Sequence, residues 1–460
     1  MTQRSLRSPF AAVLPGRGHP SINPGEGDQR SQESGCDHES GKDRNASRER
    51  IAMLPIGDPW RMPGHEKIAA PLGWGRITRM SISSSDVCVI GGGVIGLAAA
   101  ASLRDRGVDV ACFERSEPGQ GQSAGRTRQF RHLHRTPDLI DLSVRAREGW
   151  LEWEDRFFRT LLGSEGALRA GGEPGELAAL QAAGVPAHTL DAERARIRFP
   201  VAALPGGPLL WDPTAGAIRA SDTITALAQW LGPAVYRTEV SSIVVHANEE
   251  SVSVRTASGV HRSGRCLVCA GAGTDRLVRP LGLDIKQERQ AHLRLTFRTR
   301  VPPSKPLPCF SDRSGEGGEQ VYALSDLGDR YAVGLAPVTV YPAVADLAVD
   351  VPVGVSVAPQ HDRIVNYVRH TLPGLDPRPL DAVLRLTTTL PDYPEDGFAV
   401  WRRGPVIAVA GPNLFKFAPV LGERLAQTVT DQSGSADTVV ITRPTDYAGA
   451  PRAHDRGYRP

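Results

Sequence analysis

The stretch that decides the fold is VCVIGGGVIGLAAAASLRDRGVDVACFER, residues 87–115. It contains an apolar strand, a glycine turn, an alanine-rich helix and a second strand that ends in an acid. Gly91 permits the sharp bend, Gly93 lets the backbone approach a phosphate, and Gly96 packs the helix onto the strand. The N-terminus of that helix favours phosphate charge, and Glu114 lies where a carboxylate binds the hydroxyl pair of a ribose. The stretch predicts a βαβ unit that binds a dinucleotide.

Length and composition limit the other possibilities. At 460 residues the chain is longer than one hydrophobic core usually supports, which predicts two joined domains. A net charge of +3, without basic clusters interleaved with aromatic residues, gives no reason to expect a nucleic-acid partner. No run of eighteen apolar residues occurs, and the early apolar piece FAAVL is too short for a signal-peptide core. We therefore expect a cytoplasmic protein with no membrane partner.

Two short motifs have a metal-binding alternative. Cys266-x-x-Cys269 could be redox-active or bind a metal, but it is a single pair within an apolar run, which favours packed thiols. His132 and His134 form an H-x-H pair, and no further ligands follow at metal spacing. We predict no metal site.

The composition changes along the chain. Residues 1–80 are rich in Gly, Pro, Ser, Arg and acidic residues and hold all four methionines. Such a segment buries too little apolar surface to order itself, so we expect either disorder or an untranslated extension with Met80 as the start. From residue 85 the pattern alternates strands and helices, with helices expected over 139–157, 223–231 and 413–429 and a hairpin over 251–264.

This pattern predicts the α/β class: a Rossmann-like nucleotide domain assembled from discontinuous segments, with a mainly antiparallel α+β substrate domain inserted between them. The predicted boundaries are 1–80 for the extension, 81–165, 223–282 and 386–442 for the nucleotide domain, 166–222 and 283–385 for the substrate domain, and 443–460 for a polar tail.

Two features favour FAD over NAD as the dinucleotide. The strand RCLVCAGAG, residues 265–273, ends in small residues that would let the chain pass close to a flavin nucleotide. A second strand-to-helix turn, VIAVAGPNLFKFAP, follows at 406–419. A flavin is held at both ends, and a helix aimed at its pyrimidine edge stabilises the negative charge of reduction. An NAD-dependent imine reductase stays open as an alternative.

With these motifs, the chain resembles the D-amino acid oxidase superfamily of FAD-dependent oxidoreductases from about residue 86 to 442, and within it the monomeric sarcosine oxidase and N-methyltryptophan oxidase group. The loop SAGRTRQFRH, residues 123–132, is similar to that group's S-x-G-x-T-R-x-x-R-H. The resemblance implies that Thr127 and Arg128 lie beside the flavin ring and that Arg131 binds a substrate carboxylate. The similarity of residues 406–426 to the group's C-terminal turn implies a second carboxylate-binding cation at Lys416.

The predicted site has a catalytic and a cofactor-binding part. The catalytic residues are Arg131, Lys416 and Thr127. The cofactor-binding residues are Gly91, Gly93, Gly96, Glu114, Arg115, Ser123, Thr127, Arg128, Gly271, Gly411 and Lys416. An ordinary structural alternative exists for the loop residues, because Thr127 and Arg128 could cap or bridge the loop and Arg131 could be solvated.

The chain also departs from the family pattern. Leu384 stands where the sarcosine oxidases carry the cysteine that attaches FAD, so we expect noncovalent FAD. Leu386 stands at the place of a pocket tyrosine, and Ala332 and Ala336 at those of the oxygen-activating lysine and a pocket histidine. No lysine lies between residues 305 and 416, which puts rapid reaction with oxygen in doubt. We expect an apolar pocket and a substrate other than sarcosine.

Aromatic and histidine residues offer further candidates. His292 and Tyr331 could face the substrate, although packing is the ordinary role of each. Trp150 and Trp153 follow helical spacing, which favours a core role.

The predicted function is the FAD-dependent oxidation of the C–N bond of a carboxylate-bearing secondary amine or amino acid to an imine. The partners are this small-molecule substrate and oxygen or another electron acceptor. One alternative is an amino-acid dehydrogenase that passes electrons to a quinone or partner flavoprotein. Another is a catalytically silent flavin-binding protein.

Overall fold

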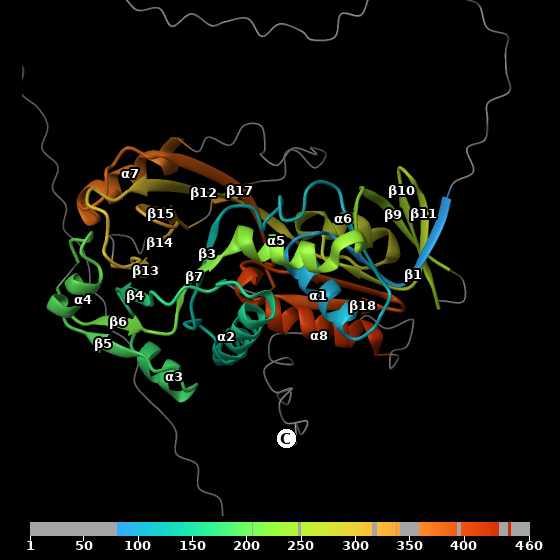
Figure 1. Ribbon diagram of the computed structural model, residues 1–460, viewed down its shortest axis with the longest axis horizontal. Helices are drawn as coiled ribbons and strands as arrows, with labels where there is room; N and C mark the ends of the chain where they lie inside the picture. Colours follow the sequence, from blue (N-terminus) through green and yellow to red (C-terminus); the bar gives the residue numbers. More distant parts are fainter. Residues whose placement is uncertain are drawn as a thin grey trace, which may run out of the picture. The chain divides into compact units, whose positions relative to one another are not determined.

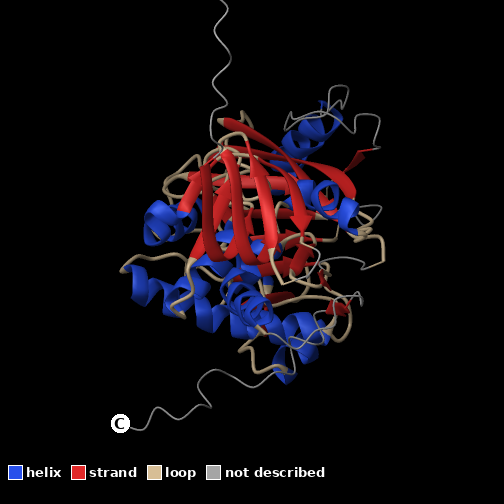
Figure 2. Ribbon diagram, turned by 90° about the vertical axis from the view of Figure 1, so that its right-hand side faces the viewer, coloured by secondary structure: helices blue, strands red, loops and turns tan. Residues whose placement is uncertain are grey.

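The computed structural model describes residues 81–204, 206–246, 250–314, 320–336, 338–340, 358–392, 397–431 and 440–442. All of them belong to one compact unit, Arg76–Pro460. The predictions for residues 1–80 and for the tail at 443–460 lie outside the described residues. Figure 1 shows the arrangement of the described elements, and Figure 2 shows the strands gathered centrally with helices along their flanks.

The predicted βαβ unit is confirmed and forms the middle of the first sheet. Strands β8, β2, β1, β11 and β19 lie in this order and pair with one another in parallel, whereas β9, β10, β18 and β20 are joined by antiparallel pairs. Within the described chain the bounds are β1 (Ser81–Ile90), β2 (Val110–Glu114), β8 (Val235–Arg237), β9 (Val240–Val245), β10 (Val252–Thr256), β11 (Gly259–Val268), β18 (Ala399–Arg403), β19 (Val406–Ala410) and β20 (Val440–Thr442). The hairpin expected over 251–264 forms by pairing of β10 with β11.

The second sheet is mainly antiparallel, with one parallel pair between β4 and β13. Its described strands are β4 (Ala167–Ala170), β5 (His188–Leu190), β6 (Leu209–Asp212), β12 (Glu288–Arg298), β13 (Cys309–Asp312), β14 (Val321–Ser325), β15 (Arg330–Leu335), β16 (Val338–Val340) and β17 (Asp381–Thr389). A small third sheet pairs β3 (Thr127–Phe130) with β7 (Gly216–Arg219).

One predicted boundary needs correction. The nucleotide domain was expected to resume at residue 386, but β17 pairs with β12 of the second sheet as far as Thr389. Residues 386–389 therefore belong by hydrogen bonding to the second sheet, because an antiparallel partner as long as β12 extends the ladder. In Figure 1, β12 and β17 lie side by side at upper centre, away from α1 and α8. The remaining domain boundaries stay a prediction.

Helices cover the sheets at the expected places. Their described bounds are α1 (Val94–Asp105), α2 (Pro137–Phe157), α3 (Glu176–Ala182), α4 (Ala192–Arg198), α5 (Ala220–Leu231), α6 (Thr274–Val278), α7 (Ala358–Thr371) and α8 (Ala418–Thr430), with short 3₁₀ turns η1 (Gly232–Ala234), η2 (Gly271–Gly273), η3 (Arg279–Leu281) and η5 (Leu414–Phe417). None of these helices is long and apolar enough to span a membrane. The cellular location stays a prediction.

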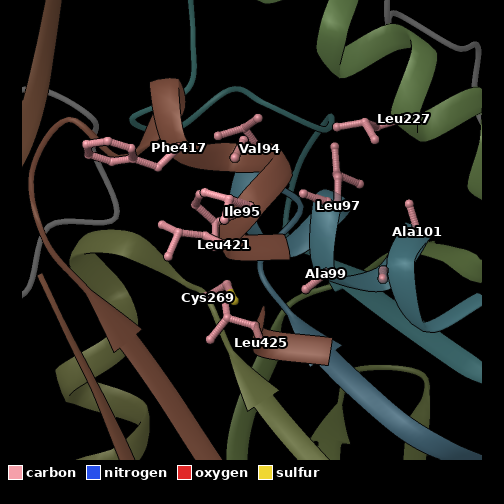
Figure 3. Packing of buried hydrophobic residues seen from close by; sticks show 14 of the residues in the cluster. Val94, Ile95, Leu97, Ala99, Ala101, Leu227, Cys269, Phe417, Leu421 and Leu425 are labelled. Carbon is pink, nitrogen blue, oxygen red and sulfur yellow. The ribbon is translucent and has the colours of Figure 1, made fainter. Parts of the chain in front are cut away.

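The alanine-rich sequence of α1 has a packing reason. Helix α8 crosses α1 so closely that a Cβ added to Gly422 would lie 2.6 Å from the Cβ of Ala98. Small side chains on both helices permit this approach, and larger ones beside them fill the core, as Figure 3 shows for Ile95 and Leu421. The two ends of the nucleotide domain, α1 and α8, are thus held together.

Candidate active site

A large cavity is lined by residues of both large sheets. Its volume is about 2390 Å³. Pockets for small molecules usually measure roughly 300–1,000 Å³, so this one has room for a dinucleotide together with a substrate. Ten of the predicted site residues line it: Gly91, Gly93, Glu114, Arg115, Ser123, Arg128, Arg131, Gly271, Gly411 and Lys416.

At one end of the cavity lies the glycine turn between β1 and α1. Gly91 has a φ of +110°, which favours glycine, and a Cβ there would collide with the carbonyl oxygen of Cys269. Gly96 does not line the cavity; a Cβ on it would collide with the carbonyl oxygen of Gly91. Glu114, at the end of β2, accepts a hydrogen bond from the Gly92 amide through Oε2 at 2.6 Å. The turn is thus a tight backbone cradle.

The N-terminus of α1 opens into the same end of the cavity. The amide of Val94 donates to the Ser123 hydroxyl oxygen at 3.0 Å, which ties the 123–132 loop to the helix. No acidic side chain stands in the first turn of α1, so its dipole is available to an anion. A cradle closed to any side chain, a helix N-terminus and a carboxylate at the end of β2 fit the pyrophosphate and ribose of a dinucleotide.

Arg128 organises the predicted flavin loop from inside. Its guanidinium donates to the carbonyl oxygens of Thr127 at 2.9 Å and Gln122 at 3.0 Å, and also to that of Ala124. It lies 5.5 Å from the ring centroid of Phe415, a residue of η5. Burial and the nearby cations Arg385 and Arg294 hold the pKa of Arg128 well below its usual range.

Thr127 occupies a different position from the one predicted. Its side chain is fully buried, does not line the cavity, and donates through Oγ1 to Oδ1 of Asp326 at 2.9 Å. Asp326 also pairs with Arg126, Nη2 to Oδ2, at 3.1 Å. The hydroxyl of Thr127 therefore fixes the loop to the chain after β14. This corresponds to the alternative in which Thr127 bridges the loop. Its assignment to catalysis and to cofactor contact stays a prediction, which this position of the hydroxyl does not support.

Arg131 is held in place by its neighbour. His132 Nδ1 lies 2.7 Å from Oδ2 of Asp212 at the end of β6, and both side chains are buried. Burial raises the pKa of Asp212, but hydrogen bonds from His132 and Thr214 outweigh it and lower that pKa. The partner that the structure gives to the His132 ring is thus a carboxylate. This hydrogen-bonded pair anchors the end of the loop, and Arg131 lines the cavity beside it.

Lys416 reaches the cavity from η5. Its side chain is 5% exposed, with Nζ 5.3 Å from the centroid of the Phe417 ring. The indole Nε1 of Trp150 donates to the Lys416 carbonyl oxygen at 2.8 Å, so helix α2 fixes the backbone that carries this lysine. Trp150 and Trp153 are buried, which confirms their predicted core role. The structure thus brings Arg131 and Lys416 to the walls of one cavity.

The structure places the candidate residues of the second sheet in two different environments. His292 lines the cavity, but Tyr331 is fully buried in the core and donates to the Pro308 carbonyl oxygen at 2.6 Å. Leu384, Leu386 and Ala336 line the cavity, whereas Ala332 is packed in a buried cluster. The pocket was expected to be apolar, but Arg128, Arg294 and Arg385, together the arginine cluster, line its wall.

Sequence reasoning missed Arg294 and Arg385. A signal was present in the alternation of Gln290, His292 and Arg294, which places the three side chains on one face of β12. Arg385 lies directly opposite His292 in the antiparallel ladder, so it shares that face. The pairing joins residues 93 positions apart in the chain and could not be read from either strand alone.

The comparisons with known proteins agree with this geometry. The family model for FAD dependent oxidoreductases, DAO, matches residues 86–428. Monomeric sarcosine oxidase of Streptomyces avermitilis is 27% identical over 392 residues, which cover 80% of this chain and 98% of that protein. The chain belongs to the DAO family of FAD-dependent oxidoreductases.

Solved structures show the same fold. NikD, described as an unusual amino acid oxidase essential for nikkomycin biosynthesis, has a TM-score of 0.66 at 24% identity and covers 77% of this chain and 96% of its own. L-proline dehydrogenase from P. horikoshii has a TM-score of 0.64 at 19% identity, covering 76% and 94%. The protein is therefore an FAD-dependent oxidoreductase, and the nicotinamide alternative is set aside.

Proposed function

We propose that the enzyme oxidises the C–N bond of a secondary amine or amino acid that carries a carboxylate, giving an imine. The observation that supports this most is the meeting of the glycine cradle, Arg131 and Lys416 in one cavity. A cation on each of two separate elements can orient an acid group that enters beside the cofactor.

The side chains of this pocket bind and orient rather than abstract protons. A guanidinium offers a planar fork that matches a carboxylate, and an ammonium adds a point charge from another direction. Arg131 and Lys416 would together fix the carboxylate and so align the neighbouring C–H bond. His132, through Asp212, keeps the Arg131 segment in place.

FAD, when bound, supplies the two-electron acceptor for this oxidation. The substrate loses two electrons and two protons as its C–N single bond becomes a C=N bond, and water hydrolyses the imine to an amine and a carbonyl compound. If oxygen is the acceptor, it takes up the two electrons and two protons as hydrogen peroxide. Leu384 in place of a thiol leaves the protein without a thioether link at that position, so we keep the proposal of noncovalent FAD.

The test is a visible spectrum of the purified protein followed by anaerobic titration with N-methyl and cyclic amino acids. We expect a yellow protein whose absorbance near 450 nm bleaches with at least one of them, with flavin released on denaturation. Bleaching by no amine of the panel would support the catalytically silent alternative and contradict the proposal.

A dehydrogenase is the second candidate function. Two observations favour it. Among the described residues that line the cavity, Lys416 is the only lysine. The position predicted for an oxygen-activating lysine holds Ala332, which is buried. Stopped-flow reoxidation by oxygen and by a soluble quinone distinguishes the two functions. Faster reoxidation by the quinone than by oxygen would assign the enzyme to the dehydrogenases.

A further inference from the structure

Three guanidinium groups converge on one point of the cavity wall. A Cβ added to Gly125, whose φ is +102°, would lie 3.3 Å from Nη2 of Arg294, 3.3 Å from Nη2 of Arg385 and 3.4 Å from Nη1 of Arg128. The three arginines come from β12, β17 and β3. Their meeting point is a small space beside a glycine, bordered by three sets of donors.

The strand register explains why the second sheet delivers its part of the cluster here. Arg385 pairs with His292 across the β12–β17 ladder, and Arg294 lies two residues further along the same face. On the other side of β12, Arg294 pairs with Gly334, which in turn pairs with Tyr322. A side chain on Gly334 would collide with the Tyr322 ring, so this glycine lets the ring lie toward the cluster. The His292 and Tyr322 rings meet edge to face at 5.1 Å.

The hydrogen-bond inventory of this wall is incomplete. Arg128 is satisfied by loop carbonyls, and Arg294 donates once, through Nη1 to the Thr127 carbonyl oxygen at 2.8 Å. Nε of Arg294, Nε and Nη2 of Arg385, and Nε2 of His292 are buried and find no partner among the described residues. Buried polar atoms of this kind are normally paired, since an unmade bond carries the full cost of desolvation.

The charge inventory shows the same imbalance. Burial, then the nearby Arg294, lowers the pKa of Arg385 to about 10, and burial together with both neighbours lowers that of Arg128. The carboxylate that counteracts this for Arg385 is Asp326, which is already bound to Arg126 and Thr127. An excess of buried positive charge is costly unless an anion compensates it.

We propose that Arg294 and Arg385, with His292 and Tyr322 beside them, bind a second acidic group of the substrate, so that the substrate is an amine or amino acid with two acidic groups. This inference rests on the proposed function, in which Arg131 and Lys416 take the first carboxylate. A carboxylate is the simplest occupant, because its two oxygens match the forks of guanidinium groups and would satisfy the orphaned donors.

The experiment measures binding to the FAD-loaded enzyme without turnover. Glutarate and butyrate, a dicarboxylate and a monocarboxylate, are titrated while the visible flavin spectrum is followed, and calorimetry gives an independent Kd. We expect glutarate to bind the wild type at least tenfold more tightly than butyrate, because a hydrogen bond to a charged group corresponds to roughly ten- to hundredfold in affinity.

Arg385→Gln should abolish the preference for glutarate and leave butyrate binding within about twofold, as expected when only the second anion is lost. The matched control is Arg298→Gln, on the same strand β12 as Arg294. Arg298 is exposed and pairs with Asp329 at 3.2 Å, so this variant should keep the preference. Arg385→Lys keeps the charge without the fork and should show an intermediate preference, which provides a test even if the glutamine variant fails to fold.

A thermal measurement distinguishes this role from a structural one. Arg385→Gln removes one of three mutually repelling cations, so the Tm of the ligand-free holoenzyme should rise. Glutarate should raise the Tm of the wild type and leave that of the variant unchanged. A lower Tm for the ligand-free variant, with the glutarate preference intact, would show that Arg385 serves folding and would overturn the proposal.

Two further outcomes separate this inference from the function on which it rests. Equal affinity of the wild type for glutarate and butyrate, while N-methyl amino acids bleach the flavin, would overturn the second anion site and leave the function standing. A shift of the flavin reduction potential in Arg385→Gln without any change in glutarate preference would assign the cluster to the cofactor and would also overturn it. A glutarate preference without bleaching by any amine would support the anion site and contradict the function.

Discussion

At the nucleotide end of the cavity, backbone amides, one carboxylate and one hydroxyl meet in short, satisfied hydrogen bonds, whereas at the arginine cluster three guanidinium groups meet with donors left over. The first end is formed by a continuous stretch of 29 residues, 87–115, and the loop that follows it. The second is assembled from three strands that are far apart in the chain. We infer that the nucleotide end recognises FAD by the shape of its backbone, and that the arginine cluster recognises an acidic group by its charge.

This difference shows which of the two regions has its geometry and its charge balance fixed without a ligand. The glycine turn is closed against any side chain, so its geometry is set before a ligand arrives. In the arginine cluster, burial and then mutual repulsion lower the pKa values of Arg128 and Arg385, so the charged groups there are not compensated by the protein alone. Substitutions at the first end should therefore destabilise the fold, and substitutions at the second should change binding more than folding.

The largest effect is expected from Gly96→Ala. Helix propensity alone would favour alanine by about 1 kcal/mol, but the new Cβ would collide with the Gly91 carbonyl oxygen. We expect a loss of about 3 kcal/mol in the free energy of unfolding, together with loss of flavin. Urea unfolding and the flavin-to-protein absorbance ratio measure both. Gly206→Ala adds the same methyl group to open space among the described atoms and serves as the control. A stable, yellow Gly96→Ala variant would contradict the shape argument.

A smaller loss is expected from Asp326→Ala. This buried carboxylate accepts the Thr127 hydroxyl and pairs with Arg126, and its removal leaves the arginine cluster with less compensation. We expect a loss of about 2–3 kcal/mol in unfolding free energy, reduced from that of a fully buried pair because Arg126 is 41% exposed. Asp326→Asn keeps an acceptor for Thr127 without the charge and should lose less. Equal losses would show that the charge has no role.

Arg131→Ala distinguishes a role of Arg131 in substrate binding from a role in cofactor binding. Loss of a charge-assisted bond should weaken carboxylate substrates by about ten- to hundredfold while flavin retention changes little. The Kd from anaerobic titration is compared with the flavin content after dialysis. If both fall in parallel, Arg131 holds the loop rather than the substrate, and the assignment of the first carboxylate fails.

Much of the nucleotide end could be predicted from the sequence. The Gly91–Gly96 turn, Glu114 and the helices α1 and α8 all depend on local patterns, in which residue type, spacing and backbone geometry are coupled over one or two turns. The side-chain partners in the loop could not be predicted in the same way. Thr127 looked suited to a cofactor, but its hydroxyl pairs with Asp326, 199 positions away.

The arginine cluster could not be predicted for the same reason, since strand pairing decides it. The sequence around Leu384 suggested an apolar pocket because two leucines replace the family's polar residues. Arg385 lies between them and lines the same cavity, and its register with His292 brings it to Arg294. A register one residue different would have placed a leucine there. Side-chain alternation shows which residues share one face of a strand, but only the tertiary structure shows which residues that face contacts.

His292 provides a pH test of the charged end. Burial, followed by the cations Arg385, Arg294 and Arg128, lowers its pKa to about 3, and Tyr322 is the other titratable group facing it. The folded state therefore holds the ring neutral, while the unfolded chain takes up a proton below about pH 6.5. Stability should fall as pH decreases from 6.5 toward 3, by up to about 1.4 kcal/mol per pH unit from this residue. In His292→Gln the slope of unfolding free energy against pH should be shallower over that range; an unchanged slope would show that the ring is protonated in the fold.

The smallest effect is expected at the link between the two ends. Ser123 accepts the Val94 amide at 3.0 Å and so acts on the first turn of α1 much as a capping residue does, although it lies in the flavin loop rather than at the helix start. Ser123→Ala leaves that amide to water or to the cofactor phosphate, so it should lower the unfolding free energy of the flavin-free protein by about 1 kcal/mol. In the FAD-loaded enzyme the loss should be smaller, because a phosphate can take over the same donor. Urea unfolding of both forms measures the two losses, with Ser123→Thr as the variant that keeps the hydroxyl. Equal losses with and without FAD would mean that this amide never meets the phosphate, and the shape-based recognition assigned to the nucleotide end would then rest on the remaining amides of the turn.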